Sequence, residues 1–473
     1  MVTEEFRNIN VVTRIEGHAK ITFVLSKSGN LEDVRFHVLE FKGFEKFMQG
    51  RMFHDAPRIT TRVCGICPVS HHLASVKACD DLLGVMIPET AKLLRELMHM
   101  AQYIHSHALH FFFLAAPDFI LGPEIKAQDR NVVGILKTNP EFVKNVIQIR
   151  KFGQNLIKLI GGKAIHPVTA IPGGMSKGLT QNDKEQILSK LKKITPLYKD
   201  LMYLCKSNLM QQIDFIKNFA VINTNFLGLT KNGVHELYDG KVRITDSDCN
   251  VLANIPPNKY FQFIGEHIEP WTYLKFPFLK IKGWPNGIYR VGPLARVNIC
   301  EKMATPVAQE ELREFQTIYG RSANQTLAYH HARLIELLYA LERAQELLEN
   351  PALISDNFRT KVTRSAGEGI GIVEAPRGTL IHHYKANSDG KLTDVNLIVA
   401  TVNNNAAMNQ SIKSAAKQLV HDGNVSNDTL NKVEMAIRAY DPCLTCAAHT
   451  INHMPMVIEF QDETGNLIKT LYR

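Results

Sequence analysis

The chain has 473 residues, of which 45% are hydrophobic and 21% charged, close to the average of globular proteins. This composition excludes a disordered or fibrous chain, and the length allows a large buried core in one domain or two. The formal net charge is +9, from 55 basic and 46 acidic residues. Because the lysines are scattered and no basic block is interleaved with aromatic residues, we expect no nucleic-acid partner.

The sequence also gives no sign of membrane insertion. No stretch reaches the roughly 18 consecutive apolar residues that a membrane helix needs. The nearest, residues 109–121, is interrupted by Pro117 and Asp118. The first residues lack the basic-then-apolar pattern of a secretory signal, so we expect a cytoplasmic protein without a membrane span.

The first half of the chain predicts a hairpin followed by helices. Residues 10–42 contain two β-like runs around a Ser-Lys-Ser-Gly-Asn turn. Residues 90–114 have apolar residues at helical spacing and predict a helix that stops before Pro117. Residues 183–219 predict a long helix broken at Pro196.

The second half predicts one more long helix, over residues 325–348, and then short strands. The expected strands are 371–373, 379–384 and 395–402, with a turn at 387–391. Loop-rich stretches are expected at 171–174 and 256–293. Together these patterns predict one mainly α-helical domain with small antiparallel β-sheets at its edges, an α+β fold.

The cysteines carry the clearest functional signal. Four of the eight are single residues, whereas the other four form two Cys-x-x-Cys pairs, Cys64/Cys67 and Cys443/Cys446. A histidine follows each pair, and 376 positions separate Cys67 from Cys443. Two such turns can bring four soft thiolates to one metal, which would join both ends of the chain in the core.

Spacing alone leaves structural zinc, a redox dithiol and a four-cysteine iron–sulfur cluster open. Two features count against structural zinc. Such sites usually take their ligands from one compact local module, and both pairs here are surrounded by charged and proton-active residues that a structural site does not require.

The two motifs, Arg62-x-Cys-Gly-x-Cys-x-x-x-His71 and Asp441-Pro-Cys-x-x-Cys-x-x-His449, resemble the two signatures of the large subunit of nickel–iron hydrogenases. Further matching segments occur in the family's order at 13–18, 42–45, 290–296 and 374–378. The chain is most similar to the catalytic subunits of cytoplasmic, bidirectional, NAD-linked members. The resemblance implies a single hydrogenase domain with a large helical core over residues 1–449, and an extension over 450–473.

By this resemblance, all four paired cysteines bind nickel. Cys67 and Cys446 would bridge to an iron that carries carbon monoxide and cyanide, while Cys64 and Cys443 stay terminal. H₂ would be split heterolytically into a hydride and a proton. The candidate bases are Cys443 and Arg377, but an arginine is a poor base because its pKa is so high.

We therefore expect Arg377 to act electrostatically, oriented by Asp118 and Asp441, and Glu16 to relay protons. A structural salt bridge for Arg377 and an ordinary helix-end acid for Asp118 remain alternatives. Glu16 has a plainer alternative too, as a surface strand acid paired with Arg14 or Lys20.

The resemblance also implies a Mg²⁺ site formed by Glu45, His449 and a backbone carbonyl near Leu397. His71 and Pro376 are expected beside the metals, His71 as a hydrogen-bond donor to a bridging sulfur. The histidines of the 103–110 segment could suggest another metal site, but packing and hydrogen bonding explain them better; they are His105, His107 and His110.

The family resemblance implies that a maturation endopeptidase cuts after His449 once nickel-insertion proteins have loaded the metal. The alternative is an ordinary C-terminal strand at 457–460 with a turn at 463–466. Because no further cysteines have cluster spacing, the electrons from H₂ must pass to another chain. We expect a small iron–sulfur subunit, together with flavin- and NAD-binding subunits, since no Gly-x-Gly-x-x-Gly fingerprint follows a strand here.

Three rival functions remain to be separated. The related subunit of respiratory NADH:quinone oxidoreductases lacks the cysteine pairs, so their presence counts against it. A hydrogen sensor, or a member that reduces sulfur or another cofactor, would keep the same site. A zinc-stapled structural protein would contain zinc and no nickel.

Overall fold

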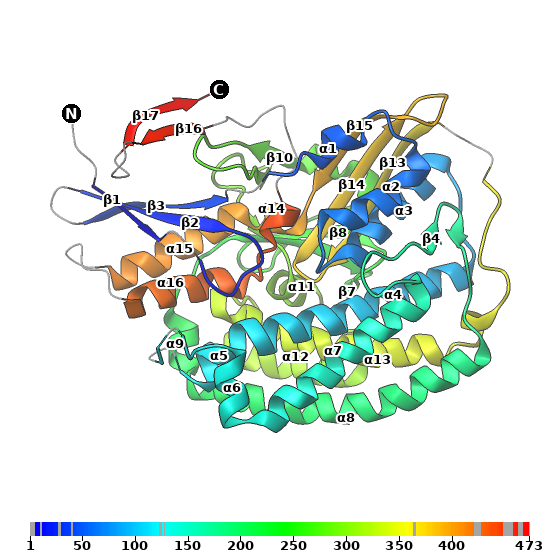
Figure 1. Ribbon diagram of the computed structural model, residues 1–473, viewed down its shortest axis with the longest axis horizontal. Helices are drawn as coiled ribbons and strands as arrows, with labels where there is room; N and C mark the ends of the chain where they lie inside the picture. The colour runs from blue at the N-terminus through cyan, green and yellow to red at the C-terminus, as the bar shows by residue number, and fades with distance from the viewer. Residues whose placement is uncertain are drawn as a thin grey trace.

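The computed structural model describes residues 5–9, 12–26, 30–38, 41–122, 125–126, 128–362, 366–420, 427–447, 457–461 and 467–472. As predicted, the fold is mainly α-helical with small β-sheets (Figure 1). The α-helices of the described residues are α1 (Phe44–Met48), α2 (Ala56–Thr60), α3 (Pro68–Leu83), α4 (Glu89–Ala108), α5 (Ala116–Ile120), α6 (Val132–Thr138), α7 (Pro140–Gly161), α8 (Gln181–Gln211), α9 (Ile213–Asn218), α10 (Tyr260–Phe263), α11 (Pro293–Ile299), α12 (Pro306–Tyr319), α13 (Tyr329–Glu349), α14 (Ala400–Asn403), α15 (Asn405–Leu419) and α16 (Asn427–Ala439).

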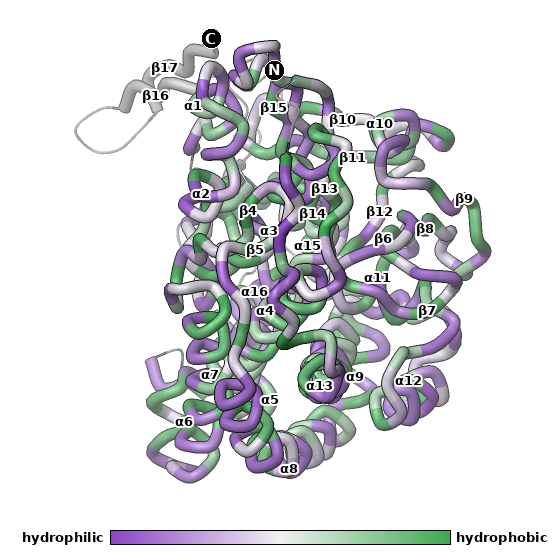
Figure 2. Tube along the Cα trace, turned by 90° about the vertical axis from the view of Figure 1, so that its right-hand side faces the viewer, coloured by the Kyte–Doolittle hydropathy of each residue, from purple (hydrophilic) through white to green (hydrophobic). Residues whose placement is uncertain are grey.

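The long helices α4, α7, α8 and α13 pack together on one side of the molecule (Figure 1). α4 lies against both α7 and α13, and α8 lies against α7 and α13. Residues 329–341 of α13 are buried without interruption, which confirms the helix predicted over 325–348. In Figure 2 these helices lie low in the view and the strands β13–β15 lie above them.

Two prolines act differently from the prediction. The helix α4 continues through a π-helical segment, Leu109–Ala115, into α5, because Pro117 occupies the first turn of α5, where its missing N–H is tolerated. α8 runs unbroken through Pro196 and ends near Gln212 instead. Pro196 and Lys192 are both exposed, so the carbonyl that loses its helical partner can be hydrated.

The strands form six small sheets among the described residues. They are β1 (Glu5–Ile9), β2 (Ala19–Leu25) and β3 (Leu31–Val38); β4 (Ala170–Ile171) and β5 (Gly174–Met175); β6 (Asn225–Lys231), β7 (Val234–His235), β8 (Lys241–Thr245), β9 (Val251–Ile255) and β12 (Tyr289–Arg290); β10 (Ile264–His267) and β11 (Phe276–Leu279); β13 (Gly367–Ala375), β14 (Gly378–Ala386) and β15 (Leu392–Ile398); and β16 (Val457–Gln461) and β17 (Leu467–Tyr472).

The hairpin predicted at 10–42 is present as β2–β3, with β1 added at its edge. The three strands predicted over 371–402 are β13–β15, although residues 400–403 form helix α14. The sheet around β6 was not predicted, and its β12–β6 pair is parallel. The 256–293 stretch, predicted as loop, contains β10, β11 and β12.

The β13–β14–β15 sheet is not at the edge of the fold but packs directly on α3. Two glycines of β13 make this approach possible. A Cβ at Gly371 would lie 2.0 Å from the carbonyl oxygen of Ala74, and one at Gly369 would lie 2.2 Å from that of Ala78. The contact fixes the start of α3 relative to the β13–β14 turn, and both carry predicted site residues.

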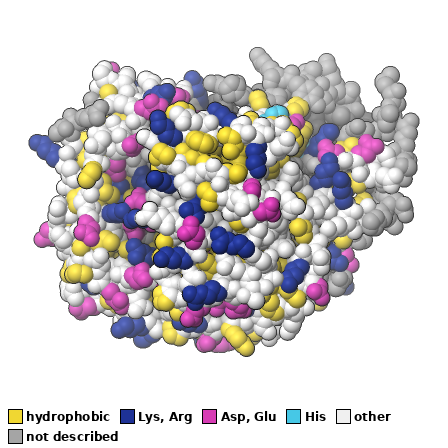
Figure 3. All heavy atoms as spheres, turned by 180° about the vertical axis from the view of Figure 1, so that it is seen from behind, with side chains coloured by type: hydrophobic (Ala, Val, Ile, Leu, Met, Phe, Trp, Pro, Cys, Tyr) yellow, Lys and Arg dark blue, Asp and Glu magenta, His cyan; other side chains and the backbone are white. Residues whose placement is uncertain are grey.

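No helix in the described part of the chain is long and apolar enough to cross a membrane. On the face shown in Figure 3, basic side chains of the described residues are interspersed with acidic ones.

Candidate metal centre

The two cysteine pairs meet in the interior. Ligand atoms of Cys64, Cys67, Cys443 and Cys446 all lie within 4.8 Å of one another, and all four residues are buried. The Sγ–Sγ distances are 3.2 Å for Cys64–Cys443, 3.4 Å for Cys67–Cys446 and 2.9 Å for Cys443–Cys446. The structure thus brings together the opposite ends of the chain, as the sequence predicts.

Short turns at helix ends aim the sulfurs of the first pair. Cys64 follows the 3₁₀ turn Thr61–Val63, and Cys67 immediately precedes α3. The backbone N–H groups of Ile66 and Cys67 donate to Cys64 Sγ at 3.1 and 3.4 Å. These two contacts fix the direction of the Cys64 sulfur, so the turn positions it for metal binding.

The second pair is attached to the N-terminal segment. The backbone N–H of Leu444 donates to the carbonyl oxygen of Glu16 at 3.1 Å. The N–H of Cys443 donates to Thr401 Oγ1 at 3.0 Å. Sequence reasoning missed Thr401, because nothing in the sequence signals its contact with the second cysteine pair.

Without metal, Cys67 differs in proton affinity from Cys443 and Cys446. Hydrogen bonds from the neighbouring sulfurs, Cys443 first, lower the pKa of Cys67 well below its ordinary value. Burial raises the pKa of Cys443 and of Cys446 well above it. Four buried sulfurs that share protons in this way are a suitable ligand set for a soft divalent metal, whose charge would replace those protons.

Glu16 lies against this cluster. Its Oε2 accepts a hydrogen bond from Cys443 Sγ at 3.0 Å and from the backbone N–H of Thr445 at 3.2 Å. The hydroxyl of Thr445 donates to the other carboxylate oxygen. The Glu16 carboxylate therefore contacts the second cysteine pair. Among the residues that it describes, the structure does not show the alternative, a surface acid paired with Arg14 or Lys20.

Arg377 and Asp441 form a buried ion pair beside the sulfurs. Arg377 Nη2 donates to Asp441 Oδ1 at 2.9 Å, and Nη1 donates to Ser106 Oγ at 3.3 Å. Burial opposes the charge of Arg377, but Asp441 and the cysteine sulfurs raise its pKa well above the ordinary value. Burial raises the pKa of Asp441 to about 6, although Arg377 acts in the opposite direction. The guanidinium therefore stays charged.

Asp118 lies elsewhere. Its carboxylate pairs with Arg14 Nη2 at 2.5 Å, Arg438 Nε at 3.3 Å and Arg130 Nε at 3.4 Å. Within the described residues it has no contact with Arg377, so the expected orienting role of Asp118 is replaced by this separate cluster. The reason is that α5 presents Asp118 to the N-terminal segment and to α16.

A small cavity adjoins the sulfurs; its lining includes Cys67, His71, Arg377, Thr401, Cys443 and Cys446. Three buried polar atoms nearby have no hydrogen-bond partner among the described residues: His71 Nε2, Arg377 Nε and Asp441 Oδ2. Cavity and unpaired atoms suit a bound group that fills the space and offers polar contacts.

His71 and Pro376, both expected beside the metals, are buried near the cavity. His71 Nδ1 lies 3.2 Å from His382 Nε2, and His382 Nδ1 lies 2.6 Å from the hydroxyl of Tyr384. Sequence reasoning missed His382, although the two-residue period of β14 places it on the same face as Tyr384. The carbonyl oxygen of Pro376 accepts from Arg296 at 3.1 Å.

Two of the three residues expected to bind Mg²⁺ come together. Glu45 is 8% exposed, and its Oε1 accepts from the backbone N–H of Leu397 at 2.8 Å. His449, the third, lies outside the described residues, as does the expected cleavage position after it.

Of the three histidines expected to serve packing and hydrogen bonding, His107 and His110 are hydrogen-bonded, whereas the buried Nδ1 of His105 has no partner among the described residues. His107 Nε2 contacts Glu336 Oε2 at 3.0 Å, and burial lowers the pKa of His107 to about 4. In the segment that follows, His110 Nε2 donates to the carbonyl oxygen of Arg438 at 2.8 Å. These rings point to different partners and do not converge on one metal.

Comparison with known proteins agrees with this geometry. A family model described as nickel-dependent hydrogenase matches residues 42–139 and 257–449, more than half of the chain. A second model, HoxL-like, matches residues 8–41. The chain belongs to the nickel-dependent hydrogenases. Its predicted family, fold and enzyme class, an oxidoreductase acting on hydrogen, are confirmed.

Relatives of this hydrogenase cover almost its full length. An F420-non-reducing hydrogenase subunit of Methanothermobacter thermautotrophicus is 45% identical over 97% of this chain and 98% of its own. NAD-reducing hydrogenase HoxS subunit beta of Cupriavidus necator is 39% identical over 97% of this chain and 98% of its own. The crystal structure of an NAD⁺-reducing [NiFe]-hydrogenase in the H₂-reduced state superposes with a TM-score of 0.91, at 41% identity, over 95% of this chain and 100% of that one.

Proposed function

We propose that this hydrogenase subunit cleaves H₂ reversibly and heterolytically at the sulfur cluster, with the proton leaving through Glu16. The observation that carries the proposal is the 3.0 Å contact between Cys443 Sγ and Glu16 Oε2. A thiol of the metal-binding group thus lies within hydrogen-bond reach of a carboxylate, which is the geometry that proton transfer requires.

The four cysteine sulfurs would hold nickel, and Cys67 and Cys446 would also bind an iron carrying carbon monoxide and cyanide. When bound, this group supplies a Lewis-acidic site that polarises H₂ and accepts its electron pair. The thiolate set, the adjoining cavity and the unpaired polar atoms around it support this fit.

The chain's own residues handle the proton. Cys443 Sγ takes it up and donates it to Glu16 Oε2, and Thr445 holds the carboxylate by its N–H and its hydroxyl. Arg377 keeps its charge, so it acts as an electrostatic and positioning group beside the cavity and not as the base. Asp441 orients it through the 2.9 Å ion pair.

The electrons leave through another chain. Among the described residues, the four paired cysteines form the one cluster of three or more His, Cys, Asp or Glu side chains suited to a metal, and the nickel site would use all four. We therefore propose an iron–sulfur partner subunit that receives the electrons, followed by flavin- and NAD-binding subunits in the cytoplasm. The 41% identity to an NAD⁺-reducing enzyme supports NAD as the acceptor.

The F420-non-reducing relatives, one of which is 45% identical, favour a second acceptor class. In that alternative the same H₂ chemistry feeds a partner that reduces neither NAD nor F420. Assaying the purified complex with NAD⁺ and with an artificial one-electron acceptor separates the two. Hydrogen sensing is the remaining alternative, and negligible turnover with every acceptor would favour it.

We further propose that Glu45, the carbonyl of Leu397 and His449 bind Mg²⁺ and that residues 450–473 are removed after nickel insertion. The 2.8 Å contact between Glu45 and Leu397 supports the first proposal. The second is supported by the family match, which ends at residue 449. Mass spectrometry of the chain from the assembled complex tests the cleavage.

The decisive experiment combines metal analysis with H₂ turnover on the purified complex. We expect nickel together with iron in excess of it, because the iron–sulfur partner contributes further iron, and also infrared bands of metal-bound diatomic ligands and H₂-dependent reduction of an artificial acceptor. Zinc in place of nickel would contradict the proposal and would indicate a structural site.

A further inference from the structure

The turn that carries Arg377 is a two-residue hairpin loop inside the protein. β13 ends at Ala375 and β14 begins at Gly378, and these two residues pair with each other. Pro376 and Arg377, which form the loop, are both buried. Gly378 has a φ of +140°, and a Cβ there would lie 2.2 Å from Val291 Cγ2, so the loop fits tightly. A buried loop needs protein partners for its carbonyl groups.

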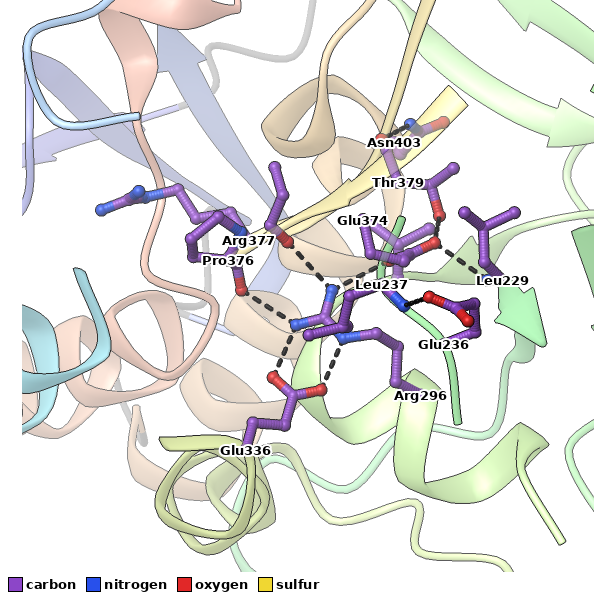
Figure 4. A network of polar contacts seen from close by, with 12 residues as sticks. Leu229, Glu236, Leu237, Arg296, Glu336, Glu374, Pro376, Arg377, Thr379 and Asn403 are labelled. Atoms are coloured by element: carbon purple, nitrogen blue, oxygen red, sulfur yellow. Dashed lines mark hydrogen bonds and ion pairs between the residues drawn. The ribbon is translucent and has the colours of Figure 1, made fainter. Parts of the chain in front are cut away.

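Arg296 of α11 supplies those partners. Its Nη1 donates to the carbonyl oxygen of Ala375 at 3.0 Å, and its Nη2 donates to that of Pro376 at 3.1 Å. The remaining donors go to Glu336, at 2.5 and 2.6 Å, and to Glu374 Oε2 at 2.9 Å. All five N–H donors of the guanidinium are thereby used, as Figure 4 shows.

The two glutamates hold Arg296 in this position. Burial opposes ionisation of Glu336, but Arg296 keeps its pKa well below the ordinary value. His107 and His235 contact the same carboxylate at 3.0 and 3.3 Å. Arg296 and Glu336 are completely buried, so the guanidinium has a fixed anchor on α13 while its other edge faces the loop.

Other residues hold the loop at its two ends. The carbonyl oxygen of Glu374 accepts from His99 Nε2 at 2.8 Å and from the hydroxyl of Tyr103 at 2.7 Å. The carbonyl oxygen of Arg377 accepts from Asn404 Nδ2 at 3.2 Å. Every carbonyl from residue 374 to 377 thus has a side-chain donor. The Arg377 side chain extends from this fixed loop, away from Arg296 (Figure 4).

We propose that Arg296 is a positioning residue for the Arg377 guanidinium, acting through the carbonyl groups of Ala375 and Pro376. This inference rests on the proposed electrostatic role of Arg377. Lysine cannot replace Arg296, because three donors on a single nitrogen cannot serve two carboxylates and two carbonyls at once. Without the hydrogen bonds from Arg296 to the carbonyls of Ala375 and Pro376, the loop could shift, and the Arg377 guanidinium would move from its position beside the sulfurs.

The test is a double-mutant cycle of Arg296→Lys and Arg377→Lys in the metal-loaded complex. It compares H₂/D₂O exchange per nickel atom with amide exchange of residues 374–381 measured by mass spectrometry. With Arg377 present, we expect Arg296→Lys to lower H₂/D₂O exchange by about 10- to 100-fold, the cost of a misplacement near 1 Å. In the Arg377→Lys background the further loss should be less than about 3-fold, because the interaction is already gone.

Arg95→Lys is the matched control. Arg95 is also fully buried, pairs with Asp80 at 2.6 Å, and clamps the carbonyls of Ile171 and Gly174 at 2.9 and 2.8 Å. Its loop is a different one. We expect a comparable loss of thermal stability, with unchanged H₂/D₂O exchange per nickel and unchanged amide exchange at residues 374–381.

Equal losses from Arg296→Lys in both backgrounds, or unchanged amide exchange at 374–381, would overturn the inference. If Arg377→Lys itself leaves H₂/D₂O exchange unchanged, the proposed role of Arg377 fails instead, and amide exchange still reports whether Arg296 holds the loop. Should Arg296→Lys not assemble, Glu336→Gln weakens the same anchor while Arg296 stays. We then expect the same dependence on Arg377 with a smaller loss.

Discussion

Replacing Glu16 by glutamine tests the proton route most sharply. The carboxylate oxygen that lies 3.0 Å from Cys443 Sγ becomes part of an amide, which cannot take up and release a proton. General acid–base groups contribute about 10²- to 10⁴-fold to rates, so H₂/D₂O exchange should fall by at least about 100-fold. The backbone contact between Leu444 and Glu16 is unaffected, so nickel and iron content should stay near normal.

Two further variants calibrate this result. Glu16→Asp withdraws the carboxylate by about 1.5 Å, one carbon–carbon bond, and should give a smaller loss than Glu16→Gln. Glu434→Gln is the control, since Glu434 is 7% exposed and bonds Thr13 at 2.5 Å without contacting the cysteines. Normal exchange in Glu16→Gln would refute the route, and loss of metal would make Glu16 structural.

Three other outcomes are expected. Cys446→Ser should abolish metal assembly, seen as loss of nickel and iron from the purified chain, whereas retention of both would contradict the four-sulfur site. Tyr384→Phe removes the hydroxyl 2.6 Å from His382 and should shift, through His71, the infrared bands of the diatomic ligands proposed for the iron, without loss of nickel. Unchanged bands would show that the hydrogen bonds from Tyr384 through His382 to His71 do not reach the metals. Burial lowers the pKa of His331 to about 3, so the unfolded chain binds the extra proton and stability falls as the pH drops from about 6.5. Denaturation of His331→Phe should show a smaller acid-induced loss, by up to about 1.4 kcal/mol per pH unit, and an unchanged slope would contradict this.

The cysteine cluster was predictable because it depends on few residues with unusual spacing. Two Cys-x-x-Cys turns can bring four thiolates to one metal, and the residues beside them carry the family signatures that favour this use over a redox dithiol. The helix α13 was predictable for a similar reason, since its apolar pattern is strong over a long stretch.

Other features depend on contacts between distant segments, which local patterns do not encode. Asp118 finds Arg14 about a hundred positions away, so its partner could not be read from the helix that carries it. Arg296 meets Glu336 and the 374–378 loop only because α11, α13 and β13 pack together. At Pro196 a local pattern predicted a helix break that the structure does not have. The proline lies on an exposed face of α8, where the helix tolerates a residue that usually ends helices.

The most direct test of the central claim is nickel X-ray absorption spectroscopy on the purified complex. If cysteines from both ends of the chain share one metal, nickel should show four sulfur neighbours at about 2.3 Å, the usual thiolate–metal distance, and a nearby iron. Two or fewer sulfur neighbours would mean that the cysteine pairs bind separately, and would contradict the account.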